Sequence, residues 1–391
     1  MLFSDVLVSQ ELKQLLINTV RNQRVSHAQL FSAQPGTHAL GLAIAYAQYI
    51  NCSHRTDADA CGVCPSCVKY RNLAHPDLYF FFPNALTARV KKDNESASFY
   101  QEWREICKET NALFSLDDWS EKLDIANKQP AINTNDISRI LEAQIAKPYE
   151  AEYKVFIIWM AEKISSKMGE KLLKCLEEPD GKTLFILISE NNDQLLPTII
   201  SRLQLVKINK PNTEDFVEIV SRKLSCSRDE AIDIASLTDN NLSDALNRKE
   251  RETTEQHHFG RFVSMMRSAY RIYYFKDPEK VIFPETVALI KELETLGRER
   301  QKSFLRYALV LTRKCILSNC NASSLVKSSS EEAAWLANFH PFINIRNGEA
   351  VMNALNEAIT NVEQNVHAGI LFTDLILILG QLIRSGDERL Q

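Results

Sequence analysis

Short apolar segments alternate with helix-patterned segments through about the first 210 residues, and this alternation constrains the fold more than any other feature of the sequence. Five segments combine strand length with β-branched or aromatic residues. They are Ala28 to Ala33, Leu78 to Phe82, Lys154 to Trp159, Thr183 to Ser189 and Gln204 to Ile208. Between them lie segments that we expect to be helical, such as Leu40 to Ile50, which is helical in composition, and Met168 to Glu178, which is followed by Pro179. The sequence therefore predicts an α/β fold with a doubly wound parallel sheet.

Residues 84–132 interrupt the alternation, because they mix charged and aromatic residues without a clean period. We interpret this segment as an insertion that forms a solvated elaboration of the surface. Its basic residues Arg89, Lys91 and Lys92 offer positive charge to DNA or to a partner protein, although a solvated loop explains them more simply.

Beyond Pro211 every apolar period is helical. A chain of 391 residues exceeds what one hydrophobic core usually serves, so several domains are expected. We predict an α/β domain over residues 1–210, a small helical domain over residues 211–250 and a larger helical domain over residues 251–391.

The composition excludes few functions beyond those of membrane proteins. No unbroken apolar run reaches the roughly 18 residues that a membrane span requires. The first residues lack a basic stretch followed by an apolar core, so we expect a cytoplasmic protein. A formal net charge of -4 gives no overall attraction to nucleic acid, although a local basic face remains compatible with it.

Four cysteines lie close together after the predicted helix Leu40 to Ile50, at Cys52, Cys61, Cys64 and Cys67. Four thiolates can complete a tetrahedral zinc shell, and such a shell leaves no position open for a catalytic water. We therefore predict a structural Zn²⁺ site over residues 52–67. Unmetallated thiols and a redox pair remain as alternatives, as does replacement of one sulfur by His54 or His75.

The turn between the first strand and the next helix lies where a nucleotide-binding P-loop would lie. The active motif, G-x-x-x-x-G-K-S/T, needs glycines for close approach to phosphate, a lysine for the phosphate charge and a hydroxyl for Mg²⁺. Around Gly36, this chain has Ala33 and His38 at the glycine positions, Ala39 at the lysine position and Leu40 at the hydroxyl position. Taken alone, the turn is indistinguishable from an ordinary strand-helix connection.

The apolar segment Lys154 to Trp159 has the pattern of a Walker B strand, which normally ends in acidic residues that hold Mg²⁺. Trp159 and Met160 stand at the positions of those acids, and Glu162 lies further along, where a helix start is expected. Both halves of the catalytic apparatus are thus degenerate. We expect no functional ATP site.

Four phrases of the sequence carry a resemblance to a known family: Ser26 to Phe31, His75 to Asp77, Leu172 to Pro179 and Leu196 to Arg202. They resemble the bacterial clamp-loader ATPases of the AAA+ class, over residues 1 to about 250. Members of that family carry a four-cysteine zinc module at this place and spacing. The resemblance implies an AAA+ α/β domain, a helical lid and a helical collar that joins a hetero-oligomeric ring.

The departures from the family pattern resemble its non-hydrolysing, or stator, subunit. In the lid signature G-S-x-R-x-A-L, Ser243 replaces the arginine that senses nucleotide. Ser201 and Arg202 match the family's S-R-C motif, with Leu203 in place of the cysteine. The resemblance implies that Arg202 acts in trans as an arginine finger, although a structural arginine at a helix end is the simpler alternative.

The partners that the resemblance implies are the gamma/tau ATPase subunits and the delta subunit, with the sliding clamp and primed DNA reached through the complex. Three other functions remain open. The chain could be a catalytically dead interaction protein of a repair or regulatory complex, an ATPase that uses unorthodox residues, or a zinc-dependent hydrolase.

Overall fold

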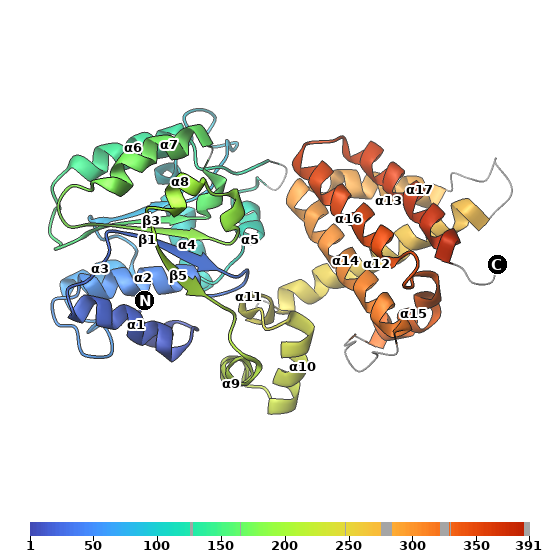
Figure 1. Cartoon of the computed structure of the whole chain (residues 1–391), viewed down its shortest axis with the longest axis horizontal. Helices are drawn as coiled ribbons and strands as arrows, with labels where there is room; N and C mark the ends of the chain where they lie inside the picture. Colours follow the sequence, from blue (N-terminus) through green and yellow to red (C-terminus); the bar gives the residue numbers. More distant parts are fainter. Residues whose placement is uncertain are drawn as a thin grey trace. The chain divides into compact units, whose positions relative to one another are not determined.

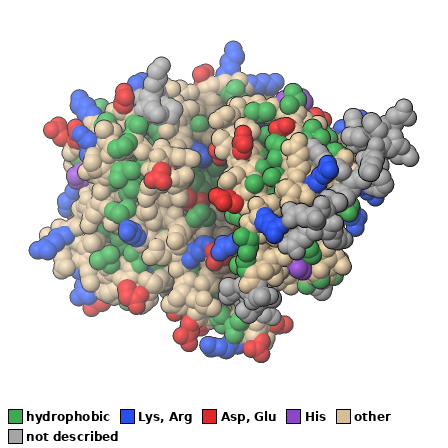
Figure 2. All heavy atoms as spheres, turned by 45° about the vertical axis from the view of Figure 1, so that its right-hand side comes forward, with side chains coloured by type: hydrophobic (Ala, Val, Ile, Leu, Met, Phe, Trp, Pro, Cys, Tyr) green, Lys and Arg blue, Asp and Glu red, His purple; other side chains and the backbone are tan. Residues whose placement is uncertain are grey.

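The computed structural model describes residues 1–125, 128–164, 166–246, 248–274, 284–320, 328 and 330–386. The chain separates into two compact units, one built from residues 1–125 and 129–246 and the other mainly from residues 247–391. On the face of the molecule in Figure 2, basic and acidic side chains are interspersed, in keeping with the small net charge of -4.

The first unit contains a parallel sheet of five strands in the order β2-β3-β4-β1-β5 (Figure 1). The strands are β1 (Ala28–Ala33), β2 (Leu78–Phe81), β3 (Lys154–Trp159), β4 (Thr183–Ser189) and β5 (Gln204–Ile208). Every residue of β3 and β4 is buried, as expected of central strands covered on both faces. The predicted fold class is confirmed.

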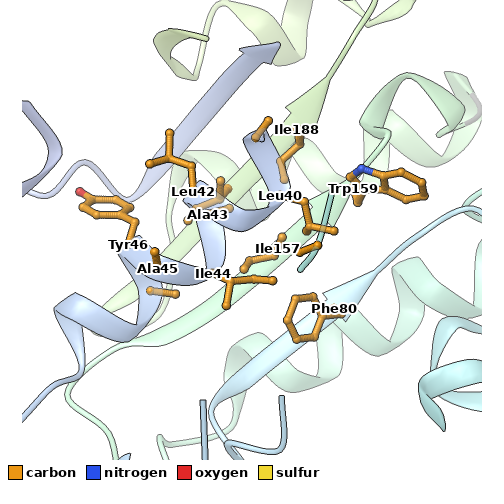
Figure 3. Packing of buried hydrophobic residues seen from close by; sticks show 14 of the residues in the cluster. Leu40, Leu42, Ala43, Ile44, Ala45, Tyr46, Phe80, Ile157, Trp159 and Ile188 are labelled. Carbon is orange, nitrogen blue, oxygen red and sulfur yellow. The ribbon is translucent and has the colours of Figure 1, made fainter. Parts of the chain in front are cut away.

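Helices cover both faces of this sheet. They are α1 (Gln10–Arg21), α2 (Ala39–Ile50), α3 (Pro65–Arg71), α4 (Tyr100–Glu109), α5 (Leu116–Lys122), α6 (Thr134–Ile145), α7 (Ser166–Glu177) and α8 (Pro197–Ile200). Short 3₁₀ helices are η1 (Phe3–Asp5), η2 (Ser96–Phe99), η3 (Ala161–Lys163) and η4 (Asn192–Gln194). Alternate strand residues belong to two separate cores, with Ile157 of β3 in one and Phe156 in the other. Figure 3 shows Leu40 and Ile44 of α2 beside Ile157 in the first of these cores.

The prediction that residues 84–132 form a solvated elaboration is wrong. The helices α4 and α5 bring Trp103 and Trp119 into the core, where their rings lie 5.2 Å apart and both side chains are buried. In α4, Trp103, Ile106 and Cys107 share one buried face at helical spacing. The helices α4 and α5 have only ten and seven residues. Their helical spacing of apolar residues is therefore hard to recognise in the sequence, because charged residues lie between the apolar ones.

Three further helices follow the sheet and enclose a small core of their own. They are α9 (Thr213–Leu224), α10 (Arg228–Thr238) and α11 (Leu242–Leu246). We refer to them as the lid helices. Their core includes Phe216, Val220 and Leu242, together with Leu7 and Leu113 from elsewhere in the first unit. The division of the chain into three domains stays a prediction.

All the regular elements described in the second unit are helices. Its helices are α12 (Arg248–Tyr274), α13 (Pro284–Thr295), α14 (Arg298–Asn319), α15 (Ser330–Phe339), η7 (His340–Phe342), α16 (Gly348–Glu363) and α17 (Ala368–Gly386). Among the described residues, one stretch, Ala368–Ser385, is long and apolar enough to cross a membrane. Leu375, Leu379 and Ile383 of this stretch are buried in the helical core, which accounts for its apolar character.

Candidate functional site

The four predicted zinc ligands come together in the structure. Cys52, Cys61, Cys64 and Cys67 place their sulfur atoms within 4.8 Å of one another, and the group that they form includes neither of the candidate histidines. Cys52 follows the end of α2, and Cys67 lies in the first turn of α3. The site therefore lies where two helices of the first unit meet.

The donor set fits a structural zinc ion. The Sγ atom of Cys64 accepts a hydrogen bond from the Cys67 N–H at 3.4 Å, and Cys61 Sγ accepts one from the Cys64 N–H at 3.4 Å. Burial opposes ionisation of Cys64, but backbone N–H groups outweigh it and lower its pKa to about 6. Burial raises the pKa of the neighbouring Cys67 thiol. A divalent cation would stabilise all four thiolates at once.

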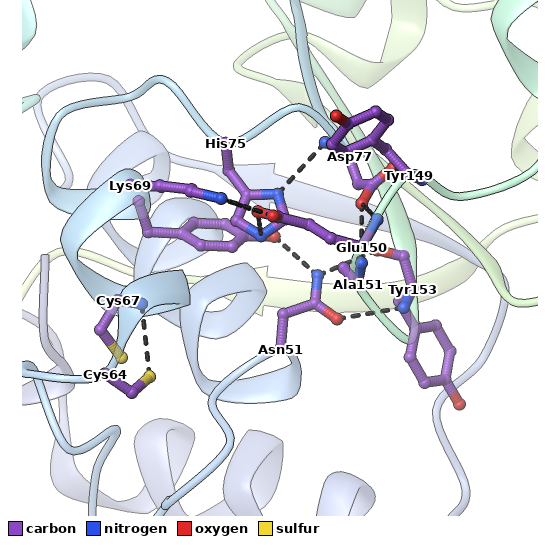
Figure 4. Close-up of polar contacts among 11 residues, drawn as sticks. Asn51, Cys64, Cys67, Lys69, His75, Asp77, Tyr149, Glu150, Ala151 and Tyr153 are labelled. Carbon is purple, nitrogen blue, oxygen red and sulfur yellow. Dashed lines mark hydrogen bonds and ion pairs between the residues drawn. The ribbon is translucent and has the colours of Figure 1, made fainter.

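The cysteine cluster is tied to the start of the sheet by Asn51 (Figure 4). Its side-chain amide donates to the Tyr70 hydroxyl at 2.7 Å and to the Tyr153 carbonyl at 2.9 Å, while its Oδ1 accepts from the Tyr153 N–H at 3.0 Å. Tyr70 belongs to α3, and Tyr153 directly precedes β3. The hydrogen bonds of Asn51 therefore join the cysteine module to the amino-terminal end of β3.

The segment His75 to Asp77 has a structural role, because it holds the residues that lead into β3. The Asp77 carboxylate accepts backbone hydrogen bonds from Tyr149 at 2.6 Å, from Glu150 at 2.9 Å and from Ala151 at 2.8 Å. His75 accepts from the Asp77 N–H at 3.1 Å, and its other ring nitrogen lies 3.3 Å from the Glu150 carboxylate. Burial lowers the pKa of His75, against the opposing effect of Glu150. One ring nitrogen is thus hydrogen-bonded and the other, which forms no hydrogen bond with a described residue, lies beside Glu150, so neither belongs to the group of four sulfurs.

His38, in the P-loop-like turn, is fully buried and bonded at both ring nitrogens. Its Nδ1 accepts from the Leu7 N–H at 3.0 Å, so the other nitrogen, Nε2, carries the proton and donates to the Asn111 carbonyl at 2.7 Å. Burial lowers the pKa of His38 to about 4. The imidazole is therefore neutral at physiological pH, and its two hydrogen bonds join the P-loop-like turn to Leu7 and Asn111.

The start of the lid helix α11 packs against the P-loop-like turn. Gly36 has a φ of +79°, and a Cβ atom added there would lie 1.8 Å from the side-chain oxygen of Asn241. The Ser243 N–H, in α11, lies 3.4 Å from the Gly36 carbonyl, with which it forms a hydrogen bond. Residues at the start of α11 thus lie directly against Gly36, the centre of the P-loop-like turn.

The positions of the Walker B acids hold apolar, buried side chains. The ring of Trp159 lies 5.4 Å from that of Trp103 and 5.1 Å from that of Phe114. Met160 is buried, with a left-handed φ of 55°. Glu162 accepts from the Glu190 N–H at 3.2 Å, and burial raises the pKa of its carboxyl group. No acid therefore stands at the two positions that follow the apolar run of β3.

Arg202 lies at the surface just beyond α8. Its Nη1 donates to the Thr198 carbonyl at 2.7 Å, and its Nε and Nη2 contact the carboxylate of Glu177, the last residue of α7. The side chains of Arg202 and Glu177 are 34% and 47% exposed. The guanidinium is thus held within its own chain but remains accessible.

The family whose profile matches the sequence is described as "DNA polymerase III, delta subunit", and the match covers residues 8–212. The DNA polymerase III subunit delta' of Bacillus subtilis (strain 168) is 28% identical over 191 residues, which are 49% of this chain and 44% of that protein. The gamma/tau subunit of Mycoplasma genitalium (strain ATCC 33530 / DSM 19775 / NCTC 10195 / G37) is 23% identical over 249 residues, 62% of this chain and 34% of that protein.

These matches span less than half the length of either relative. Among solved structures, a DNA polymerase III gamma subunit-related protein from Thermotoga maritima aligns with a TM-score of 0.40 at 14% identity, covering 94% of this chain and 99% of that one.

Proposed function

Because the chain belongs to the family described as DNA polymerase III, delta subunit, we propose that it is the non-hydrolysing stator subunit of a bacterial clamp loader. In this role it offers Arg202 to the ATP site of a neighbouring subunit and supports loading of the sliding clamp on primed DNA. The gamma/tau ATPase and delta subunits are its partners in a cytoplasmic hetero-oligomer.

One contrast carries the proposal. Apolar or neutral buried groups occupy the expected positions of the catalytic residues, whereas the candidate arginine finger, Arg202, remains accessible at the surface. The P-loop-like turn has Ala39 and Leu40 where lysine and a hydroxyl are needed, and Trp159 and Met160 replace the Walker B acids. Loss of one group that stabilises transition-state charge typically costs a factor of about 10² to 10³ in rate. With several such groups missing, the chain has no means of hydrolysing ATP by itself.

The surroundings of Arg202 support a role in trans. An exposed ion pair such as that between Arg202 and Glu177 contributes only about 0–1 kcal/mol, so a phosphate on another subunit can compete for the guanidinium. An arginine finger increases the hydrolysis rate by roughly three to five decades in comparable enzymes. The cysteine cluster supports a separate, structural role for Zn²⁺ at Cys52, Cys61, Cys64 and Cys67.

The test is DNA-stimulated ATP hydrolysis by the gamma/tau, delta and clamp proteins of the same organism, with and without this chain. We expect the wild-type chain to increase hydrolysis and Arg202→Ala to abolish that increase while still entering the complex. Arg139→Ala is the matched control, since Arg139 is another partly exposed arginine paired with a glutamate, Glu95.

Two outcomes contradict the proposal. If the chain gives no increase and forms no complex on a sizing column, it serves another assembly as an interaction protein. If the purified chain alone hydrolyses ATP, the positions of the Walker residues have been misassigned.

A further inference from the structure

Residues 110–114, which connect α4 to α5, form a tight turn inside the first unit. Asn111 and Ala112 both have left-handed φ values, of 53° and 57°. The Ala112 N–H donates to the Cys107 carbonyl at 2.8 Å, and the Leu113 N–H donates to the Thr110 carbonyl at 3.1 Å. The turn is thus closed by its own backbone hydrogen bonds, and Leu113 and Phe114 extend from it into the interior, where both are buried.

This turn contacts four parts of the first unit at once. The Asn111 carbonyl accepts the hydrogen bond of His38 from the P-loop-like turn, and its side-chain amide donates to the Asp5 carbonyl at 3.4 Å. Phe114 packs on Trp159 at the carboxyl end of β3. Leu113 belongs to the core of the lid helices. Residues 110–114 therefore contact the start of α2, the carboxyl end of β3, the N-terminal segment at Asp5 and the lid helices.

A ligand of this sheet would occupy the same place. Open parallel sheets bind ligands outside the carboxyl ends of their strands, and phosphate binds at the N-terminus of the helix that follows the first strand. In this chain α2 is that helix, and its N-cap is His38, which holds Asn111. Trp159 is the last residue of β3, which is separated from β1 by β4. Residues of the insertion thus contact both the N-cap of α2 and the carboxyl end of β3, where the general rule places a ligand.

We propose that residues 110–114 are a built-in replacement for nucleotide, which fills the cleft and fixes the lid helices on the α/β core. The insertion thereby holds the subunit in one conformation. The inference rests on the proposed function only in treating the cleft as a former nucleotide site.

Hydrogen exchange on the full-length chain tests this proposal without any clamp-loader partner. Leu113→Ala is compared with Leu123→Ala, since both leucines lie in the insertion and are almost equally buried, at 5% and 6% exposure, but only Leu113 belongs to the lid core. We expect Leu113→Ala to increase exchange in α9 and α10 at least ~10-fold, with β3 and β4 unchanged, because a cavity there weakens the lid attachment. Leu123→Ala is expected to leave lid exchange as in the wild type.

Equal effects of the two variants on the lid, or no effect of either, would overturn the proposal. If Leu113→Ala does not fold, Leu113→Val provides a milder change with the same expected selectivity. A second readout is binding of a fluorescent ATP analogue to the wild-type chain. We expect none at millimolar analogue, and saturable binding would show that the cleft is open. Because neither measurement involves a partner, failure of the stator proposal in the ATPase assay leaves this inference standing, and the reverse also holds.

Discussion

His38, in the P-loop-like turn, is a buried histidine held by two hydrogen bonds. Its ring accepts one hydrogen bond from Leu7 and donates one to Asn111. Protonation of Nδ1 would remove the acceptor and place a charge in the core, which explains why the pKa lies far below that of a free imidazole. Stability of the first unit should therefore depend on pH through this side chain, in addition to His75, whose pKa is also lowered by burial.

The expected pH dependence follows from a folded-state pKa of about 4 and an unfolded-state pKa of 6.5. Between these values the unfolded chain binds the additional proton, so the contribution is complete above pH 6.5 and is lost as the pH falls toward 4, by up to roughly 3 kcal/mol. Urea unfolding followed by tryptophan fluorescence at pH 7.5 and about 5 measures the change. His38→Gln should reduce the slope of unfolding free energy against pH. The buried His258 also has a pKa of about 4, but it contributes equally to the wild type and to the variant. An unchanged slope in His38→Gln would contradict this account.

Glu177 should restrain Arg202 in the free subunit. If Arg202 acts in trans, Glu177→Gln removes the competing charge and should raise the stimulated ATPase rate by up to about fivefold at low salt, with less effect at high salt. Steady-state hydrolysis by the assembled loader at two salt concentrations is the measurement. Glu178→Gln is the control, because it changes the adjacent carboxylate, which forms no described contact with Arg202. A lower rate in Glu177→Gln would mean that the pair is needed to position the guanidinium.

The clustering of the four sulfurs in the cysteine module is confirmed, because the spacing restricts where they can meet, whereas the zinc ion stays a prediction. We expect one Zn²⁺ per chain by elemental analysis. Removal by a chelator, or the substitution Cys64→Ser, should lower the midpoint of thermal unfolding of the first unit, since metal binding free energy contributes directly to folding. Cys320→Ser, at an exposed position outside the cluster, should keep the metal and the midpoint. Full stability of the metal-free chain would argue against a structural ion.

Other elements differ in how far sequence could predict them. The bounds of β3 and β4 follow from their nearly continuous apolar or β-branched runs, whereas β5 includes the polar residues Gln204 and Lys207. In contrast, α4 and α5 are short, and the contact of Phe114 with Trp159 joins residues whose proximity depends on the folded chain. The pairing of Arg202 with Glu177 was likewise hidden, because it joins the ends of two helices that only tertiary structure brings together.

At the scale of the whole molecule, the two units have separate hydrophobic cores. Calorimetry of the full-length chain should therefore resolve two transitions. A chelator should shift only one of them, because the four sulfurs all belong to the first unit. A single transition that shifts as a whole would show that the units unfold cooperatively.

The position of β1 in the sheet has a consequence for how the chain folds during synthesis. β1 pairs with β4 and β5, yet the chain runs from Ala33 to Thr183 before the first of these partners begins. At about 5–20 residues per second, the ribosome leaves β1 unpaired for roughly 8 to 30 s. Throughout that interval the nascent chain exposes an apolar strand with open hydrogen-bonding edges, so productive folding of the sheet waits for the emergence of its second half.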